Sequence, residues 1–287
     1  MPIDPRTPVL VGVGQVTSRP SPGDPSTWTE PLALMTAAVV RASEDAASRA
    51  GGRTALLERV DELVAIPSFV WHVADPARRV ADELSLTPRS TVLAYVGGTS
   101  PERAVLDASR RIQAGELDVA VIVGAEAMKS RDLARKAGTA VAWATQDEGV
   151  GPAPTRFEVP DAMTDHERGL GLGLPVHSYA LFEHALRRAR GWSRAEHAAH
   201  LGALAGRMSA AAARHEAAWL RDPSLGARAA VVADDNRLVS APYTKLLASN
   251  VMVDMGAALI VSSVEAARAA GVPEDRWVFP HRGAYAR

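Results

Sequence analysis

The sequence of 287 residues contains no cysteine. Disulfide bonds, thiolate metal sites and a cysteine nucleophile are therefore excluded within this chain. No uncharged apolar run approaches the roughly 20 residues that a membrane-spanning helix needs. The first residues, MPIDPRTPVLVG, show no basic segment followed by an apolar core, so no signal peptide is indicated. We therefore expect a cytoplasmic protein without a membrane partner.

An excess of charge of one sign is also missing. The formal net charge is -1, and no stripe of Lys and Arg marks a nucleic-acid partner. Hydrophobic residues make up 47% and charged residues 23%, as in ordinary soluble proteins. A chain of this length buries a large core in one or two domains.

Apolar runs alternate with helix signals along the first 130 residues. Strands are predicted at residues 9–16, 60–66, 92–96 and 119–123, and helices at residues 31–50, 75–84 and 99–114. Nearly unbroken apolar strands that alternate with helices predict a layered α/β fold with a mostly parallel or mixed sheet. Gly12 and Gly14 allow close backbone approach to the first strand.

The second part of the chain begins with a break in this rhythm. Residues 129–175 are rich in Gly, Pro, Asp and Thr, and we interpret them as an irregular functional insertion. Ser193 and Glu196 form a predicted capping box. The later predicted elements are helices at residues 176–190 and 193–214, a strand at 257–262, a helix at 264–270 and a strand that begins at 276.

The most informative segment follows the strand at residues 92–96. Gly97 and Gly98 form a tight turn, and a helix begins at Thr99-Ser100-Pro101. A helix N-terminus offers free N–H groups and a positive dipole end, which can steady an oxyanion or an acyl group. The alternative is an ordinary N-cap. A third possibility makes Ser100 a nucleophile, but that role requires an adjacent base, and the sequence indicates none.

This segment resembles the nucleophile turn of the thiolase superfamily, whose helix ends in Gln-Ala-Gly, as at residues 113–115 here. The position of the family's reactive cysteine then falls on Gly98. The segment GAEAMKS, residues 124–130, is similar to the family's Gly-Gly-x-Glu-x-Met-Ser. DMGAAL, residues 254–259, is similar to its Asp-Gly-Ala-Ala-Ala-Leu. YAL, residues 179–181, looks closest to the sterol-carrier-type branch.

The resemblance implies the N-terminal half of a thiolase-like α/β fold with an inserted loop domain. Its expected parts are a core at residues 1–130, a loop domain that contacts acyl-CoA at 131–241, a return to the core at 242–275, and the start of a C-terminal half at 276–287. In thiolases that second half carries the catalytic His and an acid–base Cys. Glu126 and Ser130 are expected to hydrogen-bond to loop backbone rather than take part in chemistry.

The resemblance also implies a site for the coenzyme A thioester, which would be substrate or ligand, with no other cofactor. Gly98, Thr99 and Ser100 would hold the acyl end. Ser249 and Asn250 match the segment where thiolases touch the pantetheine arm, although turn chemistry before a strand explains them equally. His177 lies near the CoA-contacting region; the alternative is a surface histidine. His197 and His200 lack a third ligand at useful spacing, so we expect surface histidines and no metal.

The family reaction is Claisen-type cleavage or formation of a C–C bond in lipid metabolism, an acyltransferase activity. Without the nucleophile, three hypotheses stand: part of an acyltransferase, part of a Cys-less thiolase-like aldolase, or a non-catalytic binding subunit. A homodimer is expected through the strand at residues 92–96, and a second polypeptide is a possible partner. If that partner is absent, the helix after Pro101 should expose an apolar stripe that includes Leu106.

Overall fold

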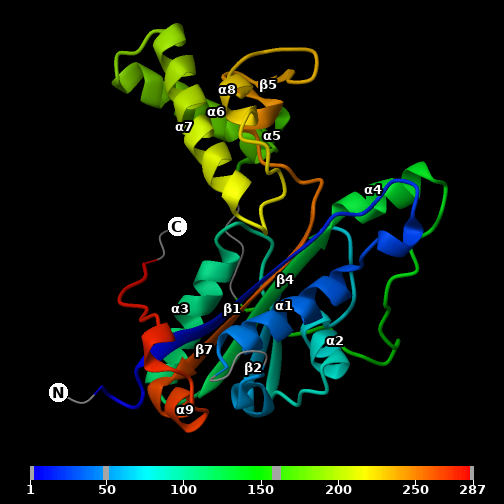
Figure 1. Ribbon diagram of the computed structural model, residues 1–287, viewed down its shortest axis with the longest axis vertical. Coiled ribbons are helices and arrows are strands. Elements are labelled where there is room, and N and C mark those ends of the chain that lie inside the picture. Colours follow the sequence, from blue (N-terminus) through cyan, green and yellow to red (C-terminus); the bar gives the residue numbers. More distant parts are fainter. Residues whose placement is uncertain (1–2, 48–51, 157–162, 285–287) are drawn as a thin grey trace. The chain divides into compact units, whose positions relative to one another are not determined.

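The computed structural model describes residues 3–47, 52–156 and 163–284 (Figure 1). The chain divides into two compact units, which we call the core unit, residues 1–159 and 252–287, and the inserted unit, residues 160–251. The inserted unit therefore differs at both ends from the loop domain expected at residues 131–241.

The core unit contains a five-stranded mixed sheet with the strand order β1-β7-β4-β2-β3. β2 runs parallel to both β4 and β3, whereas β7 is antiparallel to β1 and β4. The predicted α/β class with a mixed sheet is confirmed. The strands are β1 (Pro8–Ser18), β2 (Glu62–Ile66), β3 (Ser90–Leu93), β4 (Val119–Ala127) and β7 (Asp254–Ser263).

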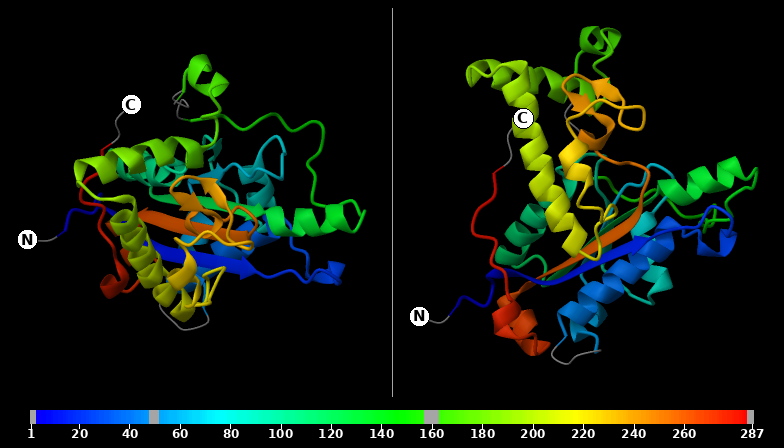
Figure 2. Two further views of the ribbon diagram at one scale, coloured as in Figure 1. Left: turned by 90° about the horizontal axis from the view of Figure 1, so that it is seen from above. Right: turned by 45° about the horizontal axis from the view of Figure 1, so that its top comes forward.

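Helices lie on both faces of this sheet (Figure 1 and Figure 2), which explains the unbroken apolar runs of β2 and β4. Val119, Val121 and Val123 of β4 belong to one core cluster, together with side chains of α1 (Pro31–Asp45) and α2 (Pro76–Glu83). The alternate residues, Ala120 and Ile122, belong to a second cluster with α3 (Ser100–Gln113). The period of two along a strand thus sorts the side chains between the two layers.

Glycines let α1 lie directly on the sheet. A Cβ atom at Gly14 would sit 2.1 Å from the carbonyl oxygen of Ala38, and one at Gly256 would sit 2.6 Å from that of Leu34. These distances are far below van der Waals contact, so a side chain at either position would push the helix away. The predicted close approach at the first strand is confirmed.

Several predicted boundaries were wrong. α1 ends at Asp45 instead of reaching residue 50, and β3 ends at Leu93 instead of residue 96. The segment expected to be irregular contains α4 (Met128–Lys136) and α5 (Asp165–Gly169). At residues 276–279 only Val278 pairs with the sheet, through two backbone hydrogen bonds to Leu10 of 2.9 and 3.0 Å.

The outer edge of β3 is occupied by a later segment of the same chain. The N–H of Leu93 donates to the carbonyl oxygen of Pro154 at 3.1 Å, and the N–H of Arg156 donates to that of Leu93 at 3.3 Å. Thr155 forms a parallel bridge with Leu93. The predicted pairing of two copies along this strand would require residues 154–156 to leave, so the geometry opposes that particular interface.

A buried carboxylate holds this edge segment in place. The Glu62 side chain is 1% exposed and receives hydrogen bonds from Arg156 at 2.6 and 2.7 Å and from Arg111 at 2.8 Å. Burial raises the pKa of Glu62, but the hydrogen bonds and charges of Arg156 and Arg111 outweigh it and hold the pKa below its usual range. Asp107 adds a further ion pair to Arg156 at 2.9 Å.

The expected apolar stripe on α3 is not exposed. Ala104, Ala108 and Ile112 are buried in the second core cluster of this chain. Leu106 is half-buried, and Gly283 lies against it so closely that a Cβ atom there would sit 1.9 Å from Leu106 Cδ2. The prediction was wrong because the sheet covers one side of the helix and residues near the end of the chain cover another.

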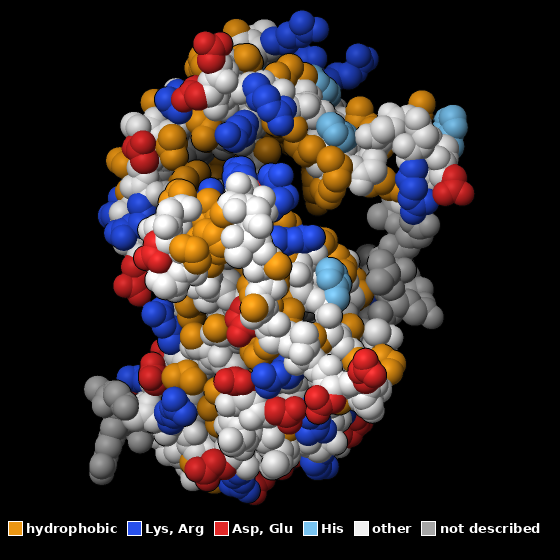
Figure 3. Space-filling view, turned by 90° about the vertical axis from the view of Figure 1, so that its right-hand side faces the viewer, with side chains coloured by type: hydrophobic (Ala, Val, Ile, Leu, Met, Phe, Trp, Pro, Cys, Tyr) orange, Lys and Arg blue, Asp and Glu red, His pale blue; other side chains and the backbone are white. Residues whose placement is uncertain are grey.

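The inserted unit is mainly helical. Besides α5, it contains α6 (Pro175–Ala189), α7 (Arg194–Arg214), α8 (Leu225–Arg228) and a hairpin of β5 (Leu238–Ser240) and β6 (Tyr243–Thr244). The capping box of Ser193 and Glu196 at the start of α7 is confirmed. On the face drawn in Figure 3, apolar and basic side chains lie side by side on this unit.

Among the described residues, no helix is both long and apolar enough to cross a bilayer. In the same ranges, no group of three His, Asp or Glu side chains is arranged to hold a metal ion.

Candidate functional site

The carboxyl ends of the parallel strands bring three loops to one edge of the sheet. Ala65 of β2 lies in register with Leu93 of β3 and Val123 of β4, so the chain leaves all three strands on the same side. Open α/β sheets bind ligands at this edge. Phe69 and Val96, which follow β2 and β3, are 62% and 51% exposed and provide apolar surface there.

Glu126 fixes the loop after β2. Its carboxylate accepts hydrogen bonds from the N–H of Phe69 at 2.8 Å and from the hydroxyl of Ser68 at 3.2 Å. The expected bonding of Glu126 to loop backbone is confirmed. This carboxylate is committed to positioning the loop.

The turn between β3 and α3 is held by Tyr95. Its hydroxyl and that of Thr99 are 2.7 Å apart, and Thr99 forms no side-chain cap on the helix although it is the N-cap residue. A Cβ atom at Gly97 would lie 2.7 Å from the Tyr95 ring. A side chain at position 97 would therefore force the Tyr95 ring to move.

Gly98 differs from its neighbour in having open space around it. A Cβ atom at this position would meet no atom of the described structure within 4 Å. The position that matches the family's nucleophile is thus open to solvent, and it lies two residues before the start of α3. A side chain or part of a ligand fits there without displacing the backbone.

Ser100 is fully buried, and its Oγ has no hydrogen-bond partner within the described ranges. No base therefore contacts this hydroxyl, and a buried oxygen is not exposed to a substrate. The possibility that Ser100 is a nucleophile finds no support in this geometry. Its unpaired oxygen lies at the first residue of α3, next to the open position.

Asp254 ties the first turn of α4 to the start of β7. Its carboxylate accepts from the N–H of Lys129 at 2.9 Å and from the Ser130 hydroxyl at 2.6 Å. Ser130 in turn accepts from the N–H of Thr29 at 3.0 Å, so its expected bonding to loop backbone is confirmed. Burial raises the pKa of Asp254 although Ser130 and Lys129 donate hydrogen bonds to it.

The remaining predicted residues belong to the inserted unit. His177 is half-buried in the first turn of α6, and Ser249 and Asn250 are exposed after the hairpin. The structure therefore brings Gly98, Thr99 and Ser100 together in one turn and leaves the other three predicted residues in a separate unit.

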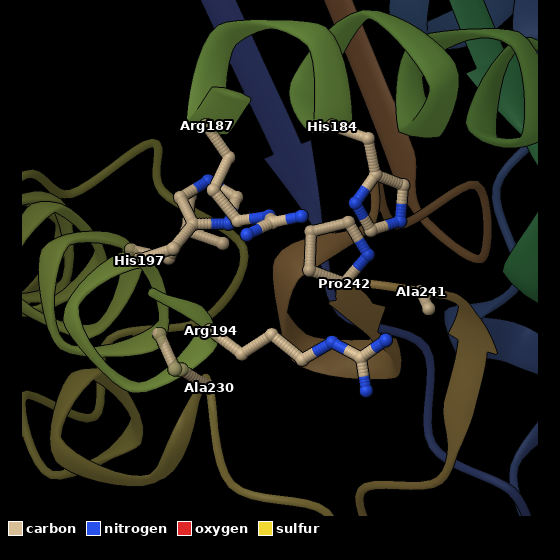
Figure 4. Close-up of a pocket in the computed structure, with 9 residues that line it drawn as sticks. His184, Arg187, Arg194, His197, Ala230, Ala241 and Pro242 are labelled. Carbon is tan, nitrogen blue, oxygen red and sulfur yellow. The ribbon is translucent and has the colours of Figure 1, made fainter. Parts of the chain in front are cut away.

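The inserted unit has its own cavity, of about 320 Å³, between α6, α7 and the hairpin. His184, Arg187, Arg194 and His197 line it, and their side chains are drawn around Pro242 in Figure 4. Sequence reasoning missed this group. Arg187 and Arg194 lie on either side of the turn between α6 and α7. This pair of basic residues around a turn is the sequence pattern that could have identified the cavity.

The prediction that His197 is a surface histidine was wrong. It is 2% exposed, its Nε2 lies 2.8 Å from Glu183 Oε1, and its ring stacks on Trp192. The Tyr243 hydroxyl donates to the other Glu183 oxygen at 2.7 Å. Burial raises the pKa of Glu183, but hydrogen bonds from Tyr243 and His197 together bring it below its usual range. Leu201 lies one turn beyond His197 on the same face, which indicated burial.

No family model and no curated protein matches the sequence. Solved structures do match. The chain is similar to a monomeric SCP2-thiolase like protein type 1 from Mycobacterium smegmatis, with 28% identity over 96% of this chain and a TM-score of 0.70. It is also similar to the Ltp2-ChsH2(DUF35) aldolase, with 21% identity over 92% of this chain and a TM-score of 0.56. Acetyl-CoA acetyltransferase from Syntrophomonas wolfei matches with 18% identity over 93% of this chain and a TM-score of 0.57.

The chain therefore has a thiolase-like fold, as the sequence motifs predicted. It spans 50%, 57% and 66% of the lengths of these three structures.

Proposed function

We propose that this protein binds an acyl-CoA thioester with the acyl end against the turn of residues 97–100, and that no acyl-enzyme forms there. The observation that carries this proposal is the open space around Gly98 beside the start of α3. A helix N-terminus favours the negative charge that develops on a thioester oxygen. Exposed Phe69 and Val96 offer apolar surface for an acyl group. A chain without cysteine has no thiolate nucleophile to accept the acyl group.

A second candidate is a role in aldol cleavage of a CoA ester together with another polypeptide. Such a reaction needs a general base and stabilisation of an enolate, but no acyl-enzyme. The similar Ltp2-ChsH2(DUF35) aldolase favours it. A non-catalytic binding subunit is the third possibility. The homodimer, the cytoplasmic location and the place in lipid metabolism stay predictions.

Binding of acetyl-CoA by isothermal titration calorimetry tests the site. We expect weak binding by the wild-type chain and at least about tenfold weaker binding by Gly98→Leu, because the new side chain fills the open space. Gly149→Leu is the matched control, since Gly149 also has no atom within 4 Å of its Cβ position and lies in a loop of the core unit. Equal affinity of Gly98→Leu and the control would contradict the proposed site.

Intact mass spectrometry after incubation with acetyl-CoA tests the absence of an acyl-enzyme. We expect no mass gain for the wild-type chain. Gly98→Cys should gain one acetyl group, because its thiolate attacks the thioester carbonyl and coenzyme A leaves as the free thiol. Acetylation of the wild type that disappears in Ser100→Ala would overturn the proposal and make Ser100 the nucleophile.

A further inference from the structure

The cavity of the inserted unit gathers basic side chains without an acidic one. His184 and Arg187 come from α6, and Arg194 and His197 come from α7 (Figure 4). Of the described residues, no Asp or Glu lines the cavity of about 320 Å³. The rest of its wall is mainly apolar and includes Leu201, Ala230 and Pro242.

Among the residues that the structure describes, the guanidinium groups of Arg187 and Arg194 have no charged partner. Arg187 donates from Nη1 to the carbonyl oxygen of Trp192 at 3.0 Å, but its buried Nε finds no hydrogen-bond partner in the described part of the chain. Within the same residues, the side chain of Arg194 forms no hydrogen bond or ion pair. Like charges that share a cavity repel, and a buried donor without a partner destabilises the fold. An anion in the cavity would relieve both.

The neighbouring carboxylate is engaged elsewhere. Glu183 is hydrogen-bonded to His197 through one oxygen and to Tyr243 through the other. These bonds hold the imidazole of His197 at the cavity wall and direct Glu183 toward His197 and Tyr243 instead of the two arginines. Arg187, Arg194 and His184 therefore remain available to a ligand.

We infer that this cavity binds the phosphate group of a small phosphate ester. The planar guanidinium group presents parallel N–H donors that match two phosphate oxygens, and the imidazole of His184 adds a further donor. The volume exceeds what a phosphate group alone fills, so an attached organic group has room against the apolar wall. The phosphate could belong to a free phosphate ester or to coenzyme A. The inference does not depend on the acyl site of the core unit.

Calorimetric titration of the full chain with inorganic phosphate, phenyl phosphate and coenzyme A, each alone, tests this inference. We expect both phosphate probes to bind the wild type, phenyl phosphate more tightly because of its ring. Arg194→Gln should weaken both by about tenfold, since it removes a charged donor at an exposed position, where the change does not disturb the core. Arg187→Lys keeps the positive charge but loses the paired N–H donors of the guanidinium group, so it should also weaken the binding of both phosphate probes.

Arg207→Gln is the matched control because it makes the same charge change on α7 at an exposed residue outside the cavity lining. No binding of either phosphate probe to the wild type overturns the inference, as does an equal loss in Arg207→Gln. If Arg194→Gln weakens coenzyme A to the same extent, the phosphate is that of coenzyme A. If it weakens only the phosphate probes, the ligand is a separate phosphate ester. Gly98→Leu should leave phosphate binding unchanged, so failure of the acyl site is recognised separately.

Discussion

The two units of this chain are stabilised in different ways. The core unit buries large apolar side chains on both faces of its sheet, including Met35, Leu63 and Ile260. In the described part of the inserted unit, Leu201 is the one large apolar side chain that is buried, whereas His197, Asn236 and Thr244 are buried and polar. The core unit thus depends on packing, and the inserted unit depends on hydrogen bonds to polar groups that water cannot reach.

The largest effect that we predict concerns Glu62, a buried carboxylate in the largely apolar interior of the core unit. Glu62→Ala leaves Arg111 and Arg156 without their shared partner and should lower the free energy of unfolding by about 3–5 kcal/mol. Glu116→Ala is the control, because Glu116 pairs with the same Arg111 but is 59% exposed, and should cost less than about 1 kcal/mol. Urea denaturation followed by circular dichroism measures both. Similar losses would show that burial does not distinguish the two pairs.

A smaller and more local effect is expected at Asn236 in the inserted unit. Its amide donates to the carbonyl oxygens of Arg228, Ala229 and Val231 and accepts from the N–H of Leu246. Asn236→Ala leaves these groups without partners and should cost about 1–3 kcal/mol. Hydrogen exchange should accelerate in the inserted unit and not in β4 or β7. Equal acceleration of hydrogen exchange in both units would contradict a local role of Asn236 in stabilising the inserted unit.

The adjacent glycines of the turn should respond in opposite directions. Gly97→Ala forces the Tyr95 ring to move and should cost about 1–3 kcal/mol. Gly98→Ala meets no atom and should stabilise the chain by up to about 1 kcal/mol, because the unfolded chain loses freedom. Thermal unfolding of the two variants decides the matter. A loss in Gly98→Ala equal to that in Gly97→Ala would remove the basis for an open acyl site.

The last prediction concerns pH and is the most gradual effect. Because the pKa of Glu62 is lowered in the folded chain, its contribution to stability is present above its ordinary value of 4.5 and is lost as the pH falls through the folded value. The stability difference between the wild type and Glu62→Gln should therefore be largest near neutral pH and shrink below pH 4.5. The pKa of Asp254 is raised, but Asp254 is present in both proteins, so its contribution cancels in the difference. A difference that grows on acidification would contradict the ion-pair network.

The sequence predicted the core unit far better than the inserted unit, and the physical reason lies in their interiors. The apolar runs at residues 92–96 and 119–123 identified β3 and β4 because strands buried on both faces carry continuous apolar residues. No apolar run marks Asn236, and Leu201 alone hints at the burial of His197, so both look like surface residues until their partners are known. Gly98 was found through its place in a motif, but the space around it depends on packing that no local pattern encodes.

The strand order also dictates when the sheet can form during synthesis. β7 lies between β1 and β4. β1 therefore cannot join the rest of the sheet until residues 254–263 have left the ribosome. At about 5–20 residues per second, the inserted unit alone delays that moment by on the order of ten seconds. During this interval β1 and the open side of β4 are unpaired edges on a nascent chain. A chaperone that covers such edges during synthesis, or faster translation of residues 160–251, should therefore increase the yield of folded protein.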